Sequence, residues 1–237
     1  MKNTRYFRWA GILMLALLMT ACASTTPATS SNTSDPRDPY ENYNRSMFRF
    51  NMAVDDNVIK PVATGYENYV PAMIRTAVGN FFGNIGDVWT AVNNYLQGKP
   101  KDGTTDVARV VFNSTFGIVG LIDVATPIGL PKHDEDFGQT LGVWGVHSGP
   151  YLILPFFGSS TVRDGIAKPV DLYADPLNQV DNVSARNVAR VLRIIDDRAD
   201  LLGSSALMEG AALDPYQFIR DAYLQRRESR VRDGASD

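Results

Sequence analysis

Apolar residues recur every three or four positions along much of this 237-residue sequence, and that spacing restricts the fold class more than any other feature. A period near 3.6 is typical of amphipathic α-helices, whereas the two-residue alternation of half-buried strands is scarce here. A first stripe comprises Tyr40, Tyr43, Met47, Phe50, Val54 and Val58. A second comprises Ile74, Val78, Phe81, Ile85, Val88, Val92 and Tyr95. We therefore expect a mainly α, single-domain protein in which both stripes pack into the core.

Capping residues and prolines predict where these two helices begin and end. Asp38 followed by Pro39 predicts the start of the first helix, because aspartate caps helices and proline suits the first helical position. Pro61 predicts the end of that helix, since a proline inside a helix removes a hydrogen bond. Pro71 predicts the start of the second helix.

Further helices are expected in the C-terminal half. The spacing of Thr161 and Asp164 resembles a capping box, and Ser184 is expected to cap the helix after it. Asp214 and Pro215 predict the start of the last helix. Basic residues suit a helix C-terminus, so four arginines near the end predict a solvated tail: Arg226, Arg227, Arg230 and Arg232.

Two segments do not follow the helical pattern. Residues 107–130 are apolar nearly all round and are interrupted by Gly117 and Gly120, so they are too short and too broken to span a membrane as one helix. A buried core hairpin and a re-entrant or interfacial segment both fit this composition. Residues 136–158 are rich in glycine and in aromatic residues, which occur at membrane–water boundaries and also in protein cores.

The N-terminus predicts export. Residues 1–21 have the pattern of a secretory signal peptide. They begin with three positive and no negative charges, continue with the apolar run 9–19, and end in small residues before Cys22. The apolar run is shorter than the roughly 20 residues that span a bilayer. Without the signal the formal charge falls from −3 to −6, which argues against nucleic acid as a partner.

Cys22 is the only cysteine of the chain and ends the segment Leu18-Met-Thr-Ala-Cys22. This segment resembles a bacterial lipobox, and the resemblance implies acylation of Cys22 by chains such as palmitate. Ala23 in place of aspartate implies delivery to the outer membrane. Residues 22–35 are small and polar and predict a flexible tether, 36–232 a helical domain, and 233–237 a disordered tail.

Catalytic and metal-binding patterns are weak in this sequence. His133 and His147 are the only histidines, and neither stands in a recognisable triad motif. The cluster 133–136 groups possible metal ligands without the spacing of a known site. We expect neither an enzyme nor a metal site, although a lipid hydrolase with an unrecognised site remains an alternative function.

Eight ordered segments resemble the MlaA (VacJ-like) family of outer-membrane lipoproteins across nearly the whole predicted domain. They are 38–51 (DPYENYNRSMFRFN), 60–71 (KPVATGYENYVP), 78–85 (VGNFFGNI), 92–98 (VNNYLQG), 113–125 (NSTFGIVGLIDVA), 136–146 (DFGQTLGVWGV), 149–164 (GPYLILPFFGSSTVRD) and 214–216 (DPY).

The resemblance implies a helical ring that lies in the inner leaflet of the outer membrane, on its periplasmic side, beside a trimeric porin. It implies removal of mislocalised phospholipid from the outer leaflet and delivery to a periplasmic MlaC-like carrier, which maintains lipid asymmetry. No cofactor is implied beyond the lipid anchor at Cys22. A structural lipoprotein that braces porins or the envelope is a further alternative.

Two sets of residues are candidates for that activity. The segment 113–125 is predicted to form a hairpin or broken helix along the lipid path, with a buried hairpin capped by Asp123 as the alternative. The path candidates are Asn113, Thr115, Phe116, Gly117, Ile118, Gly120, Ile122 and Asp123. The gating candidates, in a segment where the family resembles a sensitive region, are Phe48, Phe50 and Asn51.

Overall fold

The computed structural model describes residues 35–205 and 213–233. The predicted signal peptide, Cys22, the tether before residue 35 and the tail after residue 233 lie outside these ranges. The expectation of a mainly α, single-domain fold is confirmed. The principal helices are α2 (Glu41–Val54), α3 (Lys60–Tyr69), α4 (Ala72–Leu96), α5 (Pro100–Phe116), α6 (Phe137–Val143), α7 (Val162–Ala174), α8 (Val183–Asp200) and α10 (Pro215–Val231).

The predicted ends of the first helix are wrong at both sides. Helix α2 begins at Glu41, and Asp38 is fully buried, where it accepts a hydrogen bond from Nδ2 of Asn44 at 2.8 Å instead of capping the helix. Pro61 does not end the helix, because the π-helical turn η1 (Asp55–Ile59) leads directly into α3. Pro61 then lies in the first turn of α3, directly after the π-helical turn.

The other predicted caps agree with the structure except for one. Thr161 Oγ1 accepts a hydrogen bond from the Asp164 amide at 3.3 Å, and Asp214 Oδ1 accepts one from the Tyr216 amide at 3.0 Å. Helix α8 is capped by Asn182, whose Oδ1 accepts from the Ala185 amide at 3.0 Å, instead of by the predicted Ser184. Asparagine is at least as good a cap as serine, so the earlier of the two residues begins the helix.

A short antiparallel hairpin interrupts the helical run. Strand β1 (Tyr151–Leu154) pairs with β2 (Gly158–Thr161), with Tyr151 opposite Thr161 and Leu154 opposite Gly158. The hairpin packs on α2 and α10 through a small apolar cluster. This cluster comprises Tyr151, Ile153 and Tyr216, with Met47, Phe48, Tyr223 and Leu224 at its edge.

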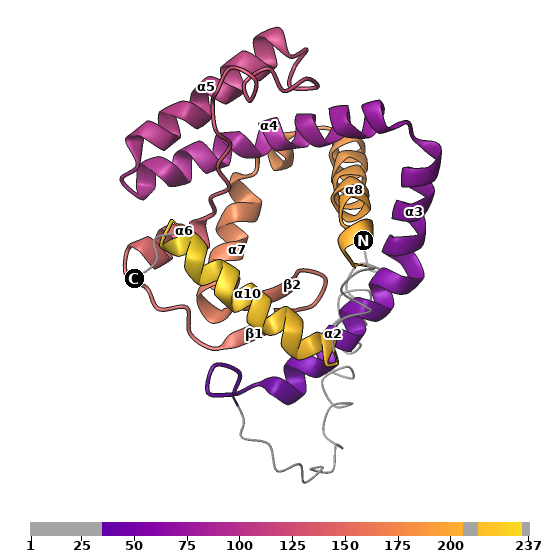
Figure 1. The fold of residues 1–237 in the computed structure, drawn as a ribbon, viewed down its shortest axis with the longest axis vertical. Coiled ribbons are helices and arrows are strands. Elements are labelled where there is room, and N and C mark those ends of the chain that lie inside the picture. The colour runs from indigo at the N-terminus through magenta and orange to yellow at the C-terminus, as the bar shows by residue number, and fades with distance from the viewer. Residues whose placement is uncertain (1–34, 206–212, 234–237) are drawn as a thin grey trace, which may run out of the picture. The chain divides into compact units, whose positions relative to one another are not determined.

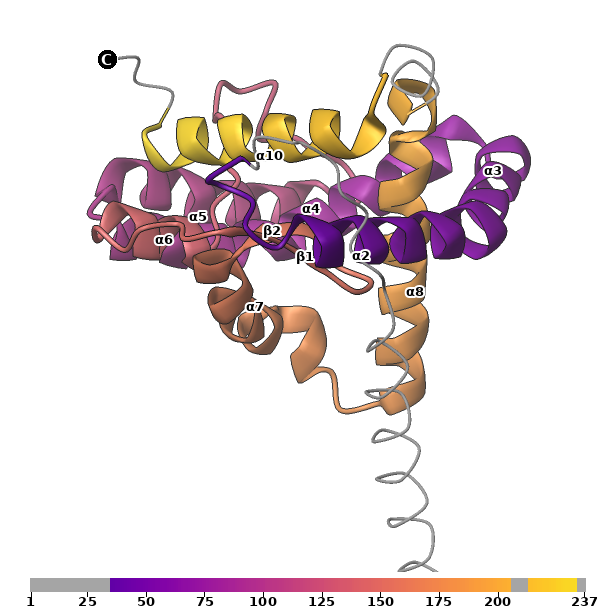
Figure 2. The same ribbon diagram turned by 90° about the horizontal axis from the view of Figure 1, so that it is seen from below.

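The helices of the described unit form a ring (Figure 1). Helices α2, α3 and α4 follow one another along the edge, α6 and α10 complete the remaining side, and α7 and α8 lie on the inner side of α4 (Figure 1). In the perpendicular view α2 to α6 form one layer, α10 lies on one face of it, and α8 runs across the layer (Figure 2). Among the described helices, none combines the length and the apolar character needed to cross a membrane.

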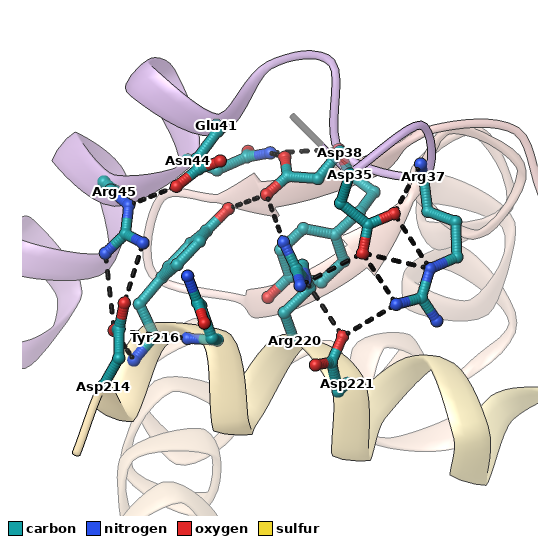
Figure 3. Close-up of polar contacts among 12 residues, drawn as sticks. Asp35, Arg37, Asp38, Glu41, Asn44, Arg45, Asp214, Tyr216, Arg220 and Asp221 are labelled. Carbon is teal, nitrogen blue, oxygen red and sulfur yellow. Dashed lines mark hydrogen bonds and ion pairs between the residues drawn. The ribbon is translucent and has the colours of Figure 1, made fainter. Parts of the chain in front are cut away.

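A polar network ties α10 to the beginning of α2 and so closes the ring (Figure 3). The buried carboxylate of Asp38 accepts hydrogen bonds from the Tyr216 hydroxyl and, at 3.3 Å, from Arg220 Nη1. Arg45 of α2 forms an ion pair with Asp214, the cap of α10, at 2.8 Å. Charged hydrogen bonds thereby join the two ends of the described unit, in addition to the apolar packing of Phe48 on Tyr216.

Candidate functional site

Helix α4 buries its polar face and exposes its apolar face. Its buried side chains include Asn84, Asp87, Thr90, Asn93 and Asn94. The expectation that its apolar stripe packs into the core is therefore wrong for the residues that are at least 40% exposed, which are Ile74, Val88, Val92 and Tyr95. The first stripe behaves in the same way at Tyr40, Tyr43, Phe50 and Val58.

The same inversion extends over the described residues. Ten hydrophobic side chains are buried, against nineteen polar or charged ones, while thirty-eight large hydrophobic side chains are exposed. A water-soluble protein of this size would bury most of those apolar groups and keep its charges outside. The outer surface of this unit is therefore suited to an apolar environment.

Buried polar groups are stable here because they bind one another. Asn94 Nδ2 donates to Asp106 Oδ2 at 2.7 Å, and Thr140 Oγ1 donates to Asn93 Oδ1 at 2.8 Å. Arg109 of α5 is 1% exposed and forms an ion pair with Asp87 of α4 at 3.2 Å. Such pairs satisfy the hydrogen-bonding capacity that burial would otherwise leave open.

Arg109 also fixes the segment that follows α5. It pairs with Asp123 at 3.2 Å and donates to the Leu130 carbonyl at 2.8 Å. Burial alone would raise the pKa of Asp123, but hydrogen bonds from Thr126 and Arg109 outweigh it and hold that pKa well below the usual range. The segment 117–130 is thus anchored by an ionised carboxylate.

Two cavities meet on the inner side of α4 and together form what we call the central hollow. A cavity of about 680 Å³ lies between α4 and α8, and a cavity of about 870 Å³ extends from α4 to α7 and α8. Five residues line both: Gly86, Thr90, Asp134, Arg193 and Asp197. A third cavity, of about 1010 Å³, lies between α10 and the segments 36–37 and 148–150.

The central hollow is amphipathic. Its eight acidic side chains are Asp87, Asp134, Glu135, Asp171, Asp175, Asp196, Asp197 and Asp200, and its five basic ones are Arg75, Lys132, Lys168, Arg190 and Arg193. Exposed apolar side chains also line it, namely Leu172 and Tyr173 of α7, Phe157 of the hairpin turn and Ile194 of α8. Charged and apolar side chains therefore line the same hollow, which fits a ligand that is itself amphipathic.

The acids of α8 crowd one another. Burial raises the pKa of Asp196, whose Oδ1 accepts a hydrogen bond from the Tyr66 hydroxyl at 2.7 Å, and nearby Asp200 raises it further. Burial also raises the pKa of Asp197, and Asp196 and Asp200 add to that effect while Arg193 opposes it. This concentration of like charge favours the arrival of a cationic group.

None of residues 113–125 lines the central hollow or the third cavity. Asn113 is 3% exposed, and its Oδ1 accepts hydrogen bonds from the amides of Val124 and Ala125 at 2.8 and 2.9 Å. Asp123 Oδ1 accepts from the Ala125 and Thr126 amides at 3.1 Å each. Asp123 therefore caps the turn as the alternative expected, but the hairpin of that alternative was a buried one, and both the buried hairpin and a lipid path along this segment stay predictions.

The apolar members of that segment point away from the polar contacts. Phe116, Ile118 and Ile122 are 68%, 62% and 50% exposed, and Thr115 is exposed as well. Ile118 and its neighbour Val119 have φ values of 53° and 58°, which β-branched residues rarely adopt. Gly117 and Gly120 are buried, and a side chain on either would overlap neighbouring atoms.

The gating candidates all contact the hairpin. Phe48 packs edge-on against Tyr216 with ring centroids 5.8 Å apart, within the cluster on β1. Phe50 packs against Phe156 at the hairpin turn, at 5.2 Å. Asn51 Nδ2 donates to the Leu154 carbonyl at 3.0 Å, and its Oδ1 accepts from the Phe156 amide at 2.8 Å. Their role in gating stays a prediction.

The sequence reasoning missed two features. Arg227 does not lie in a solvated tail, because it is buried and forms ion pairs with Asp136 at 2.6 Å and Asp164 at 2.9 Å. The charged residues of α8 were also overlooked. Three arginines precede the acids along the helix, an order that is visible in the sequence and opposes the helix dipole, and Arg198 in the last turn is the exception.

The histidines show no catalytic arrangement among the described residues. His133 Nδ1 lies 2.8 Å from Asp106 Oδ1, and His147 is exposed. In the described ranges, the structure holds no group of three or more histidine, cysteine or carboxylate side chains that could hold a metal ion.

The fold and the site define a ring of helices with an apolar outside, a polar interior and an amphipathic hollow. The family model described as "MlaA lipoprotein" matches residues 36–230. This chain belongs to the MlaA lipoprotein family.

Relatives of known name and structure agree with this assignment. The intermembrane phospholipid transport system lipoprotein MlaA of Escherichia coli is 35% identical over 227 residues, covering 93% of this chain and 87% of that protein. The protein of the same name from Haemophilus influenzae is 32% identical, with coverages of 94% and 89%. A solved structure, reported as a structural basis for maintenance of bacterial outer membrane lipid asymmetry, matches with a TM-score of 0.71 and 37% identity, covering 82% of this chain and 98% of that one.

Proposed function

We propose that this protein is an outer-membrane lipoprotein that removes mislocalised phospholipid from the outer leaflet and passes it to a soluble periplasmic carrier. Its named relatives are lipoproteins of an intermembrane phospholipid transport system. The observation that carries the proposal is the inverted distribution of side chains, with polar groups inside and apolar groups outside.

The inversion supports a place for the ring within one leaflet. Apolar side chains at the perimeter would contact acyl chains, where a charged surface would be costly. The headgroup would pass through the central hollow along its charged groups, and the acyl chains would lie against Phe157, Leu172, Tyr173 and Ile194. Downhill movement of a lipid along such a path needs no cofactor.

The anchor and the partners complete the proposal. Acylation of Cys22 would hold the protein at the periplasmic side of the outer membrane, and residues 23–35 would give the ring freedom to settle in the leaflet. A trimeric porin would support the ring laterally, and an MlaC-like carrier would receive the lipid. The lipid would leave chemically unchanged, because the protein acts as a conduit and not as a hydrolase.

Gly86 offers a direct test of the route. It lines both cavities of the central hollow, and a Cβ built on it meets nothing within 4 Å. Gly86→Trp therefore fills the hollow without disturbing the packing of α4. Gly65→Trp is the matched control, because Gly65 lies on α3, also has open space at its Cβ, and lines neither cavity.

The measurement is the amount of phospholipid exposed on cells that lack the protein and are complemented with each variant, read out by an externally added phospholipase. We expect the wild type and Gly65→Trp to lower surface phospholipid and Gly86→Trp to leave it high. Full activity of Gly86→Trp would rule out the hollow as the route. Surface phospholipid that stays high with the wild type would refute the proposed function itself.

A further inference from the structure

The charges on α8 run against the dipole of their own helix. Arg186 and Arg190 lie in its N-terminal half and Arg193 just past its middle, whereas Asp197 and Asp200 lie in its last turn together with Arg198. A helix favours acidic residues near its N-terminus and basic residues near its C-terminus. Asp197 and Asp200 are therefore unfavourably placed with respect to the dipole of their own helix.

The same charges form one stripe that faces the central hollow. Arg190, Arg193, Asp197 and Asp200 are three or four residues apart, which places them on one side of a helix, and all four line the hollow. Because α8 runs across the layer of helices (Figure 2), the stripe presents a basic stretch and then an acidic stretch along the proposed route.

Some charged groups of this stripe remain available to bind a ligand. Arg193 uses Nη1 for Asp175 at 2.7 Å, which leaves the other nitrogens of its guanidinium available. The carboxylates of Asp197 and Asp200 make no hydrogen bond or ion pair within the described ranges. Each half of the stripe can therefore receive a charged group of opposite sign.

We propose that the central hollow selects phospholipids whose headgroup carries both a phosphate and an ammonium group, as in the ethanolamine class. Arg190 and Arg193 bind the phosphate, and Asp197 and Asp200 bind the ammonium. This inference rests on the proposed function and names the substrate class for it.

The balance of charge in the hollow supports the same selection. Eight acidic side chains face five basic ones, so the enclosed space carries net negative charge. An excess of one sign of charge in a cavity disfavours ligands of that sign. A headgroup with a phosphate alone, as in the glycerol class, meets this repulsion without compensation, whereas an ammonium group offsets it. Burial is the main cause of the raised pKa values of Asp196 and Asp197, and neighbouring acids add to it.

The test uses the full-length, lipidated protein and vesicles of phosphatidylethanolamine and phosphatidylglycerol in equal amounts. The bound phospholipid is extracted and its headgroups are quantified by mass spectrometry. We expect the wild type to be enriched in the ethanolamine lipid and Asp197→Asn/Asp200→Asn to lower that enrichment by about two- to tenfold, as expected for partly exposed charge pairs. Asp181→Asn, which removes one acid outside the hollow, keeps the wild-type ratio.

A second variant tests the basic half. Arg190→Met lowers the total amount of bound phospholipid and leaves the ratio of headgroups above one, because the phosphate is common to both classes. The proposed headgroup selection is overturned if the wild type and the double variant bind normal amounts of lipid with the same ratio of ethanolamine to glycerol headgroups. That result leaves the proposed function standing. No phospholipid bound by the wild type overturns both. An unchanged total in Arg190→Met overturns the assignment of the phosphate.

Discussion

Replacement of Arg109 by methionine tests whether buried charge holds this fold together. The guanidinium is 1% exposed and contacts Asp87 at 3.2 Å, Asp123 at 3.2 Å, Thr126 Oγ1 at 3.0 Å and the Leu130 carbonyl at 2.8 Å. Methionine keeps the length and the apolar stem of the side chain and removes all of these contacts. Asp87, whose side chain is 2% exposed, then keeps Lys132 at 3.1 Å as its one ion-pair partner within residues 35–205 and 213–233.

The expected loss is large because a buried carboxylate is left undercompensated. Removal of one partner of a buried ion pair costs about 3–5 kcal/mol. For a protein of this size each kcal/mol lowers the melting temperature by about 2–4 °C, so Arg109→Met should melt about 6–20 °C lower. Asp87→Asn/Arg109→Met should lose less than the single variant, because the uncompensated charge is gone.

The measurement is thermal unfolding of the purified protein in detergent, followed by circular dichroism. Arg226→Met is the matched control, because Arg226 is exposed on α10 and makes no ion pair within the described ranges, so it should shift stability by less than about 0.5 kcal/mol. A melting temperature of Arg109→Met within 2 °C of the wild type, on the order of the control, refutes the reasoning. So does a double variant that is less stable than Arg109→Met.

Three further predictions follow from other parts of the molecule. Cys22→Ser should leave an unacylated precursor, which mass spectrometry of the purified protein detects; an acylated product in this variant contradicts the anchor. Deletion of Phe50–Asn51 should turn the preceding part of α2 by about 200° relative to the rest, break its contacts with the hairpin and make lipid movement leaky; normal asymmetry of the outer membrane argues against gating. Arg227 outweighs the effect of burial and holds the pKa values of Asp136 and Asp164 below the usual range. The two ionised carboxylates therefore contribute their full stabilisation above about pH 4, and this stabilisation is lost as the pH falls through their lowered pKa values in the folded protein. Denaturation midpoints should therefore fall in acid, less steeply in Arg227→Met, and equal slopes contradict this account.

The existence and type of the helices could be predicted from the sequence because the 3.6-residue period does not depend on what surrounds a helix. The caps at Thr161 and Asp214 were predictable for the same reason, since they act through local hydrogen bonds. The burial of Asp38 was not, because its partners Tyr216 and Arg220 lie about 180 positions away in the sequence.

Whether the apolar face of each helix points to the core or to the surface also could not be predicted from the sequence. A stripe of apolar residues shows which side of a helix avoids water, and a protein core and a membrane satisfy that preference equally. The polar faces of the helices indicate better than the apolar stripes which side of a helix is buried. On α4, Asn84, Asp87, Asn93 and Asn94 repeat at helical spacing, and short amides and carboxylates of this kind can satisfy one another when buried.

Arginines near the C-terminus show why position in the sequence misleads. Arg227 and Arg230 lie one turn apart on α10, yet only Arg227 is buried, between Asp136 and Asp164. Arg230 is partly exposed and binds Asp134 at 2.6 Å. Which of them would enter the interior depends on how α10 lies across α6 and α7, and that is a tertiary contact.

The polar interior and the apolar surface belong to one physical solution. When lipid surrounds a fold, apolar side chains gain little by leaving the surface, because acyl chains are as apolar as the core. Cohesion must then come from groups that lipid cannot satisfy, and Arg109, Asp38 and Arg227 sit at the centres of such networks. On the inner side of α4, beside α7 and α8, charged side chains also line the central hollow. Polar interactions thus stabilise the ring, and polar side chains are also what the proposed path for a headgroup requires.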